Sequence, residues 1–361
     1  TLKWVELDGS GNELPLTMKK QAPAGDGYTV SGLTAGKNYR FYAYGENLKI
    51  INAYQYNYNN NSDNILKVEQ WGKAKWTSFQ YAFYNCKNLD VTATDKPDLL
   101  DVENMQYAFQ DCPALVNSNG SMRGWDTRNV KYMDYMFKGA ISFNSPLDGW
   151  NTEKVQSTSY MFQGATSFNQ PLSNWNTEKV TSMSSMFKGA TSFNQPLDGW
   201  NIKSLRNAEQ MLSSCGMDCI YYSLTIISWA DNADTPSNIT LGAGNMHYNI
   251  EGNTARNYLQ NNLHWTIQGD LSDPNCSGSI VNIWVGSISN DWDTSGNWDS
   301  GHIPEKNSEQ DIVFATAENH GGVSAQRDLH INGEVIVGKL INDNPTYGVV
   351  ITPQNSLTAN Q

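Results

Sequence analysis

The side chains that most often carry chemistry are sparse in this chain, and their spacing fits no metal site. Five histidines are spread over 361 residues without the His-Glu-x-x-His spacing or any other pairing that places two imidazoles on one ion. They are His247, His264, His302, His320 and His330. Each is therefore predicted to be a surface or turn residue.

Nucleophilic sites of known pattern are also missing from the sequence. It has no Gly-x-Ser-x-Gly elbow, no phosphate-binding P-loop and no Cys-x-x-Cys, and the spacing of Cys215 and Cys219 is wrong for a zinc site. Asp and Glu are numerous, so the paired carboxylates of a glycosidase stay open as an alternative. We expect a protein that is not an enzyme and that needs no metal or cofactor.

Three tryptophans are the best candidates for ligand contact. Trp150, Trp175 and Trp200 recur every 25 residues and, if exposed, would form an aromatic strip on which sugar rings could stack. A packed core produces the same regularity, and half-burial at a corner of each repeat is the interpretation we favour. Solvent exposure of the three rings decides between the two.

The composition favours a secreted protein over one that binds nucleic acid. Lys and Arg total 24 against 36 Asp and Glu, and the resulting net charge of −12 repels nucleic acid and anionic membranes. Only 17% of residues are charged, whereas 12 Trp, 18 Tyr and 29 Gly are typical of strand-rich secreted bacterial proteins. No run of 18 apolar residues occurs, so no membrane-spanning segment is expected.

A repeat of 25 residues organises the middle of the chain. Its marker, Met followed by Phe or Leu, occurs four times at this interval, and two degenerate copies precede these. The markers begin at Met136, Met161, Met186 and Met211. Within a copy, apolar residues at i, i+3, i+6 and i+7, as between Val180 and Phe187, predict one face of a short helix.

Each predicted helix ends at a glycine, and an extended segment follows it. Gly139, Gly164 and Gly189 stand where a left-handed terminal residue is expected, and the Ser-Phe-Asn-Gln-Pro-Leu segment after them is too short for a helix. Such a unit cannot bury its apolar face alone, so about six copies are expected to stack. The predicted fold class is α/β, a leucine-rich-repeat-like solenoid flanked by small all-β modules.

A column of asparagines follows the repeat. Asn144, Asn169 and Asn194 each come after a Phe and would superpose in stacked copies, about one strand spacing apart. Their side chains could satisfy backbone groups at the turn, which is the interpretation we favour, or form an exposed binding row.

The cysteines follow the repeat as well. Cys86, Cys112 and Cys215 occupy a position that holds Ala in other copies, which predicts small, buried and reduced side chains rather than a disulfide between Cys86 and Cys112. Cys219 and Cys276 complete a total of five, so at least one thiol is unpaired within a monomer.

The repeats resemble a known family. Residues 65–109, and the copies of "MF.GA.SFNQPL..WNTEKV" after them, resemble the BspA-like leucine-rich-repeat surface proteins of anaerobic gut and oral bacteria. Residues 221–270 look like the cap that closes such arrays. The resemblance implies an extracellular or surface-anchored protein used for adhesion, with no catalytic residues. Leu212 and Thr158 depart from the pattern at the marker Phe and at a Met column.

These patterns divide the chain into three parts. Residues 1–45 alternate like strands and are predicted to be a β module that caps the first coil, residues 46–270 to be the repeats with a cap at 213–270, and residues 280–361 to be an all-β module. The chain begins with Thr, which is compatible with removal of an export signal, and it ends without an obvious sorting signal, which favours a truncated or processed last module.

One turn in the first part has a partial calcium-loop spacing. Asp8, Ser10 and Asn12 alternate as the first ligands of such a loop do, but Lys19 stands where an acidic ligand is required. A hairpin turn is therefore preferred.

The predicted function is that of a non-enzymatic bacterial cell-surface or secreted protein that mediates adhesion or macromolecular interaction through its repeat-built surface. A glycan-binding module that uses the Trp strip is the alternative, and a structural spacer is a third hypothesis. The expected partner is a host or microbial surface protein or polysaccharide, and the chain is expected to be monomeric.

Overall fold

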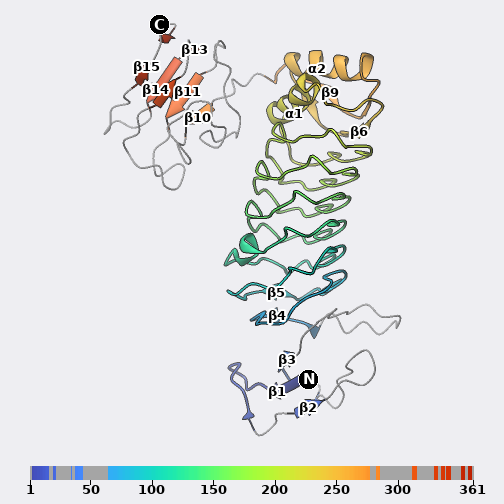
Figure 1. The fold of residues 1–361 in the computed structure, drawn as a ribbon, viewed down its shortest axis with the longest axis vertical. Coiled ribbons are helices and arrows are strands. Elements are labelled where there is room, and N and C mark those ends of the chain that lie inside the picture. The colour runs from blue at the N-terminus through green and yellow to red at the C-terminus, as the bar shows by residue number, and fades with distance from the viewer. Residues whose placement is uncertain are drawn as a thin grey trace.

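The fold is that of a computed structural model, which describes residues 2–15, 19–21, 34, 37–43 and 64–276, and seven strands between residues 282 and 359. Figure 1 shows the stacked coils of the middle of the chain, with the N-terminal strands beside their first coil. The described residues of this middle part carry the large buried core.

The first part of the chain forms a small antiparallel sheet. Its strands are β1 (Leu2–Glu6), β2 (Lys19–Gln21) and β3 (Tyr39–Ala43), in the order β2-β1-β3. The turn after β1 is closed by Asp8, whose Oδ1 accepts the backbone N–H groups of Ser10 at 2.8 Å and Asn12 at 2.9 Å. The preferred hairpin turn is confirmed, and these bonds lower the pKa of the Asp8 carboxyl.

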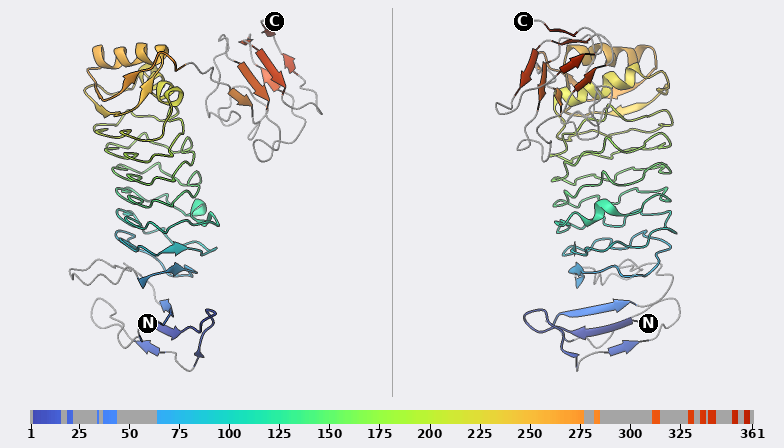
Figure 2. Two further views of the ribbon diagram at one scale, coloured as in Figure 1. Left: turned by 180° about the vertical axis from the view of Figure 1, so that it is seen from behind. Right: turned by 60° about the vertical axis from the view of Figure 1, so that its left-hand side comes forward.

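The repeats lie one upon another as flat coils (Figures 1 and 2). The first two are joined by a parallel pair of short strands, β4 (Lys67–Val68) and β5 (Asp90–Val91). Later coils are joined by single parallel bridges, from Tyr132 to Ser157 and onward to Ser182 and Asn207. The bridged residues are 25 apart, so the sequence repeat is also the repeat of the backbone contacts.

The helix predicted in each repeat is wrong. No α-helix lies in residues 64–213; between Met133 and Gly139 every second amide donates to the next coil, as Phe137 N–H does to the Met161 carbonyl at 2.9 Å. The amides between them close three-residue turns, as Lys138 N–H does to the Tyr135 carbonyl at 3.1 Å. Bonds to a neighbouring coil replace the bonds along the chain that a helix needs.

The predicted fold class must therefore be corrected. Within the described residues there are two α-helices, both after residue 218, and small sheets of two or three strands. This is not the α/β leucine-rich-repeat-like solenoid, flanked by all-β modules, that the sequence pattern predicted. The apolar spacing is satisfied instead by consecutive tight turns, which also place every third or fourth side chain on one side.

The glycine at the end of each turn was placed correctly. Gly139, Gly164 and Gly189 have φ of 70°, 68° and 71°, the left-handed region that glycine enters without strain. Their amides also bond to the next coil, as Gly139 N–H does to the Gln163 carbonyl at 2.8 Å. The predicted conformation is therefore present, although no helix precedes it.

Columns of identical side chains fill the space inside the coils. Phe137, Phe162 and Phe187 stack with ring centroids 5.7 Å apart, and a second column of Phe143, Phe168 and Phe193 has a spacing of 6.0 Å. All six rings are fully buried. The marker Phe and the Phe of the extended segment thus form the core that the repeat predicted.

A cap with both α-helices closes the last coil. Helix α1 (Cys219–Asp231) packs on α2 (Ile250–Asn261), and four short strands pair in parallel beside them. These strands are β6 (Thr240–Gly242), β7 (His247–Tyr248), β8 (Thr266–Gln268) and β9 (Leu271–Ser272). Neither helix, within the described residues, has the length and apolar character needed to cross a bilayer.

The helices of the cap begin at side chains that accept backbone amides. Asp218 accepts from Tyr221 N–H at 2.9 Å, and Asn249 accepts from Gly252 N–H at 2.8 Å. A buried ion pair holds α2 to the end of the cap, because both carboxylate oxygens of Asp270 accept from the Arg256 guanidinium at 2.8 and 2.9 Å.

The described strands of the last part pair only in parallel. Strands β10 (Asn282–Trp284), β11 (Asp311–Phe314) and β14 (Lys339–Asn342) form one sheet in that order. Two further pairs join β12 (Leu329–Ile331) to β15 (Ile351–Pro353) and β13 (Val335–Val337) to β16 (Leu357–Ala359). The rest of the predicted module 280–361 lies outside the described residues.

The close approach of neighbouring coils can be tested at two glycines in one column. A Cβ added at Gly149 would lie 2.3 Å from the Arg123 carbonyl oxygen, whereas one added at Gly199 meets nothing within 4 Å. We expect Gly149→Ala to lower the free energy of unfolding by about 1 to 3 kcal/mol. Gly199→Ala, the matched control, should change it by less than about 1 kcal/mol. Equal denaturation midpoints for the two variants would contradict the close approach.

The phenylalanine columns predict a large loss of stability on truncation. Phe168 is fully buried between Phe143 and Phe193 and also stacks at 4.0 Å on Phe162 of its own coil. We expect Phe168→Ala to lower the free energy of unfolding by about 3 to 5 kcal/mol in denaturant titration. The exposed Ser173→Ala in the same coil serves as the control, and a Phe168→Ala variant as stable as this control would show that the column is not core.

Candidate functional site

The three tryptophans proposed as a ligand-contact strip are buried. Trp150, Trp175 and Trp200 are 3%, 4% and 2% exposed. Their indole N–H groups donate to carbonyls of the preceding coil, at Met122, Leu147 and Leu172, over 2.7, 3.1 and 3.1 Å. The rings are core residues, as favoured over an exposed strip, and they are buried more completely than the half-burial that we expected; they offer no face on which a sugar could stack.

The asparagine column ties the coils together. The Oδ1 atoms of Asn144, Asn169 and Asn194 accept the backbone N–H of Asn169, Asn194 and Asp218 at 2.9, 2.8 and 2.9 Å. The structural ladder is therefore confirmed. The side chains are exposed or half-buried rather than turned into the core, because they sit at the edge of each coil.

The cysteines of the repeat are core residues. Cys86, Cys112 and Cys215 are buried thiols, so the alternative disulfide between Cys86 and Cys112 is wrong. Burial raises the pKa of the Cys215 thiol to about 11 and also raises the pKa of Cys112, whose Sγ lies 3.0 Å from the Phe83 carbonyl oxygen. Cys112 and Cys215 therefore have little thiolate at neutral pH and are poor nucleophiles.

One disulfide was not foreseen. Cys219 and Cys276 are bonded over a separation of 57 residues. The sequence held one signal for it, because these are the two cysteines that do not fit the Ala column of the repeat.

The histidines and carboxylates of the described residues form no metal site. No three His, Cys, Asp or Glu side chains lie together in that part of the chain as ligands would. His247 and His264 are exposed on the cap, as expected of surface residues. His302 and His320 lie outside the described residues, and His330 is in β12.

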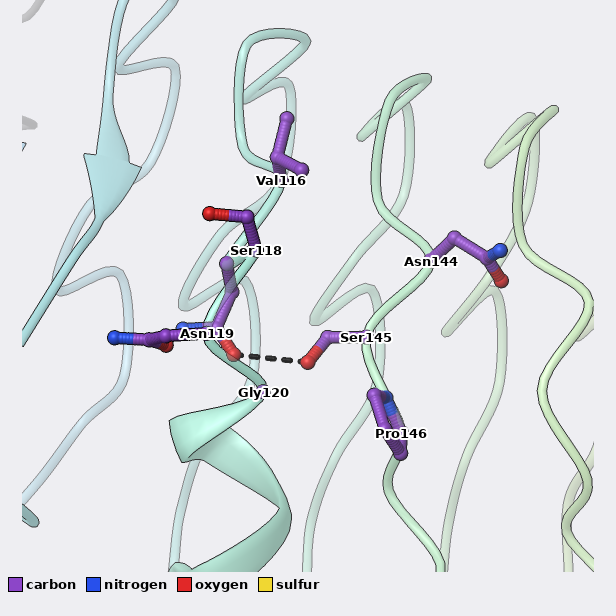
Figure 3. Close-up of a pocket in the computed structure, with 8 residues that line it drawn as sticks. Val116, Ser118, Asn119, Gly120, Asn144, Ser145 and Pro146 are labelled. Carbon is purple, nitrogen blue, oxygen red and sulfur yellow. Dashed lines mark hydrogen bonds between the residues drawn. The ribbon is translucent and has the colours of Figure 1, made fainter. Parts of the chain in front are cut away.

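Two hollows open between neighbouring coils. The first, of about 410 Å³, is lined by residues 116–120 and 144–146 (Figure 3). The buried Asn117 among its lining residues already has hydrogen-bond partners, because it accepts from Ser145 Oγ at 2.8 Å and donates to the Val91 carbonyl at 3.0 Å. The second, of about 340 Å³, lies over residues 149–153, Asn174 and Asn176. Neither brings together acid, base and nucleophile.

The feature best placed to contact a partner is a column of tyrosines. Tyr81, Tyr107, Tyr135 and Tyr160 stack with centroids 4.4, 4.7 and 4.4 Å apart and with planes within 12°. All four are half-buried, so their edges reach the surface. We call these four residues the tyrosine column. Each stands one or two residues before a core aromatic or marker Met, a regularity that the sequence analysis overlooked.

The backbone under the tyrosine column is strained. The four tyrosines have φ between 57° and 61°, a left-handed conformation that bulky side chains rarely adopt. Ser185 and Gln210 continue the column with φ of 53° and 55°, so the same backbone accepts other residues. Each such residue costs about 1 to 3 kcal/mol of backbone strain, and stacking of the four rings offsets part of this cost.

Polar side chains accompany the tyrosine column. Gln106 donates to Asp134 Oδ2 at 2.7 Å, and Ser157 Oγ donates to the other oxygen of Asp134. Lys138 Nζ lies 5.5 Å from the Tyr135 ring centre. The carboxylate of Asp134 thus accepts from an amide of the preceding coil and a hydroxyl of the following coil, and so joins three coils.

The hydroxyls of Tyr107 and Tyr135 stay protonated at physiological pH. Burial raises the pKa of Tyr107 to about 12, with further contributions from Tyr81 and Tyr135, and burial also raises the pKa of Tyr135. Each hydroxyl can therefore donate and accept a hydrogen bond. The inner rings, Tyr107 and Tyr135, have both faces covered by neighbours, so they present edges and hydroxyls rather than open faces.

Comparison with known proteins gives a family without an assigned function. The chain is similar to the model of a family described as "Mycoplasma protein of unknown function, DUF285" over residues 51–120, 77–181 and 103–219. These overlapping matches fall on the repeats and span a little less than half of the chain, so they mark a repeat-containing protein. They do not single out the BspA-like leucine-rich-repeat family. No curated protein matches this chain, and neither does any solved structure.

The buried thiols predict low chemical reactivity. We expect Cys86, Cys112 and Cys215 to stay unmodified when the folded, oxidised protein meets a thiol-specific chromogenic disulfide at pH 8, because burial opposes both access and ionisation. The same protein in guanidinium chloride should release three equivalents of chromophore, one for each thiol. Rapid release from the folded protein would contradict the burial.

Proposed function

We propose that this chain is a non-enzymatic bacterial surface protein that binds a macromolecular partner through the face of the coils that carries the tyrosine column. The observation that carries this proposal is the column itself, four half-exposed rings held on a left-handed backbone. Stacking compensates part of the strain. A partner that covers the exposed edges would compensate more.

The chemistry of the column favours a protein as partner over a polysaccharide. Tyrosine buries a rigid apolar edge and offers a hydroxyl, and it is enriched where proteins contact one another. Sugar rings bind to open aromatic faces, and the faces of Tyr107 and Tyr135 are occupied. The glycan-binding alternative rested on the Trp strip, and those rings are buried.

Two further features support a surface location and a binding role. The Cys219–Cys276 disulfide fits an oxidising compartment outside the cytosol. The two hollows between coils are open to solvent rather than enclosed, which suits an extended partner more than a small substrate. The resemblance of the repeats to BspA-like surface proteins points the same way.

A binding experiment with a tyrosine variant tests this proposal. Fluorescently labelled full chain is added to cultured epithelial cells and to intact bacteria, and saturable binding is expected to one of them. In the Tyr107→Ser, Tyr135→Ser double variant the half-saturating concentration should rise at least about tenfold, as for interface tyrosines generally. The fold should tolerate serine there, because Ser185 has the same backbone conformation.

The controls separate the column from other surface tyrosines. Tyr258→Ser changes a 45% exposed tyrosine on α2 and should leave binding unchanged. Protease treatment of the cells should abolish binding, whereas a glycan array should stay blank. Unchanged binding of the double variant would show that the tyrosine column is not the contact surface. A positive glycan array would show that the partner is not a protein.

A further inference from the structure

The disulfide encloses nearly the whole cap in one covalent loop. Cys219 is the first residue of α1, and Cys276, 57 positions later, follows strand β9 at the end of the described range 64–276. Between them lie both helices and strands β6 to β9. A pulling force applied to the chain at Cys276 can therefore reach Cys219 by two routes. One is the backbone of the cap, and the other is the disulfide bond.

The C-terminal end of the cap, at strand β9, is held by few contacts. Strand β9 has two residues, Leu271 and Ser272, and pairs only with the two residues of β7. The Leu271 and Asp273 amides donate to the Met246 and Tyr248 carbonyls at 2.9 Å each. The Leu271 side chain is 54% exposed and adds little packing. The next firm contact is the buried pair of Asp270 with Arg256.

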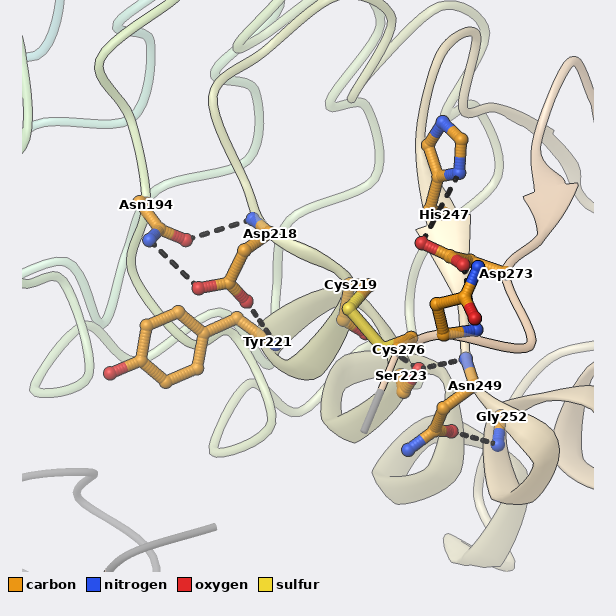
Figure 4. The surroundings of a disulfide bond; sticks show 11 residues. Asn194, Asp218, Cys219, Tyr221, Ser223, His247, Asn249, Gly252, Asp273 and Cys276 are labelled. Atoms are coloured by element: carbon orange, nitrogen blue, oxygen red, sulfur yellow. Dashed lines mark hydrogen bonds and ion pairs between the residues drawn. A yellow bond between two sulfur atoms is a disulfide. The ribbon is translucent and has the colours of Figure 1, made fainter. Parts of the chain in front are cut away.

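The route across the disulfide connects Cys276 directly to Cys219, the residue that follows Asp218, which contacts the coils. Asp218, next to Cys219, donates its N–H to Asn194 Oδ1 and accepts from Asn194 Nδ2, both at 2.9 Å (Figure 4). Asn194 in turn donates to Asn169, and Asn169 to Asn144. The disulfide is thus attached at the end of the asparagine ladder that joins one coil to the next.

We propose that the Cys219–Cys276 disulfide is a mechanical clasp. It transmits tension from the chain beyond residue 276 to the asparagine ladder, and it keeps residues 220–275 folded while the coils bear the load. Without the clasp, β9 peels from β7 and the cap unravels before the coils do. This property does not depend on which partner the tyrosine column binds.

Single-molecule pulling on the full chain, held at its two ends, tests the clasp. The oxidised protein should show no extension from the 57-residue loop. The Cys219→Ser, Cys276→Ser double variant should show about 200 Å of added contour length, at roughly 3.6 Å per residue, before the first step from the coils. Hydrogen exchange before pulling checks that the variant has a folded cap.

Reduction of the unaltered protein is the second measurement. Dithiothreitol gives two electrons and two protons to the bond, so both cysteines become thiols while the reagent closes to its cyclic disulfide. The reduced protein should then extend as the double variant does. Cys215→Ala, which places the residue of other copies in the core, should behave as the oxidised protein.

Three outcomes decide the proposal. Added length that precedes the coil steps, in both the reduced protein and the double variant, supports it. No difference between oxidised and reduced protein shows that the bond carries no load. Added length that follows the opening of the coils shows that the cap needs no clasp, and either of these last two results overturns the proposal.

Discussion

The whole arrangement depends on one set of bonds, the backbone hydrogen bonds that pass from each coil to the next. In the turn around the marker, alternate amides donate to a neighbouring coil, as Tyr135 does to Ser159 and Phe137 to Met161, both at 2.9 Å. These bonds fix the register at one repeat, and equivalent side chains then superpose. The stacked phenylalanines, the buried tryptophans, the asparagine ladder and the tyrosine column are all consequences of this register. A slip of one residue would break every column at once.

The sequence predicted which side chains are buried better than it predicted the backbone that buries them. The 25-residue period correctly identified the core phenylalanines, the left-handed glycines and the cysteines that replace alanine. The helix prediction was wrong because the spacing of apolar residues shows only which side chains lie on the same side of the backbone. A spacing of three and four residues fits a helix, but it also fits a series of tight turns whose amides bond elsewhere. The carbonyl that accepts from each of these amides belongs to the neighbouring coil. The sequence of a single copy of the repeat therefore does not reveal it.

The candidate site was missed for a related reason. Tryptophan and tyrosine both recur with the period, but the sequence pattern led us to consider only the tryptophans among the aromatic residues, and the asparagine row beside them, as ligand contacts. Trp150 and Trp175 turn inward, where their indole N–H groups satisfy carbonyls of the preceding coil. The tyrosines come just before the marker, and their rings are half-buried rather than fully buried. Position within the coil, more than residue type, decided which aromatic column meets solvent. The Cys219–Cys276 disulfide was hidden by distance in the chain, since no local pattern links residues 57 apart.

The distribution of charge bears on the partner proposed for the tyrosine column. Residues 64–213 hold 14 Lys and Arg and 14 Asp and Glu, so 14 − 14 leaves the repeats neutral, and the net charge of −12 lies elsewhere in the chain. Within the repeats, several charges pair between coils, as Lys131 does with Glu103 and Lys179 with Glu153. Exposed pairs of this kind contribute little energy and cancel the long-range field. For the partner proposed above, the balanced charges of the repeats provide no long-range attraction. If the proposal holds, we expect recognition to depend on short-range fit to tyrosine edges and hydroxyls, with slow association and with specificity set by the shape of the contact.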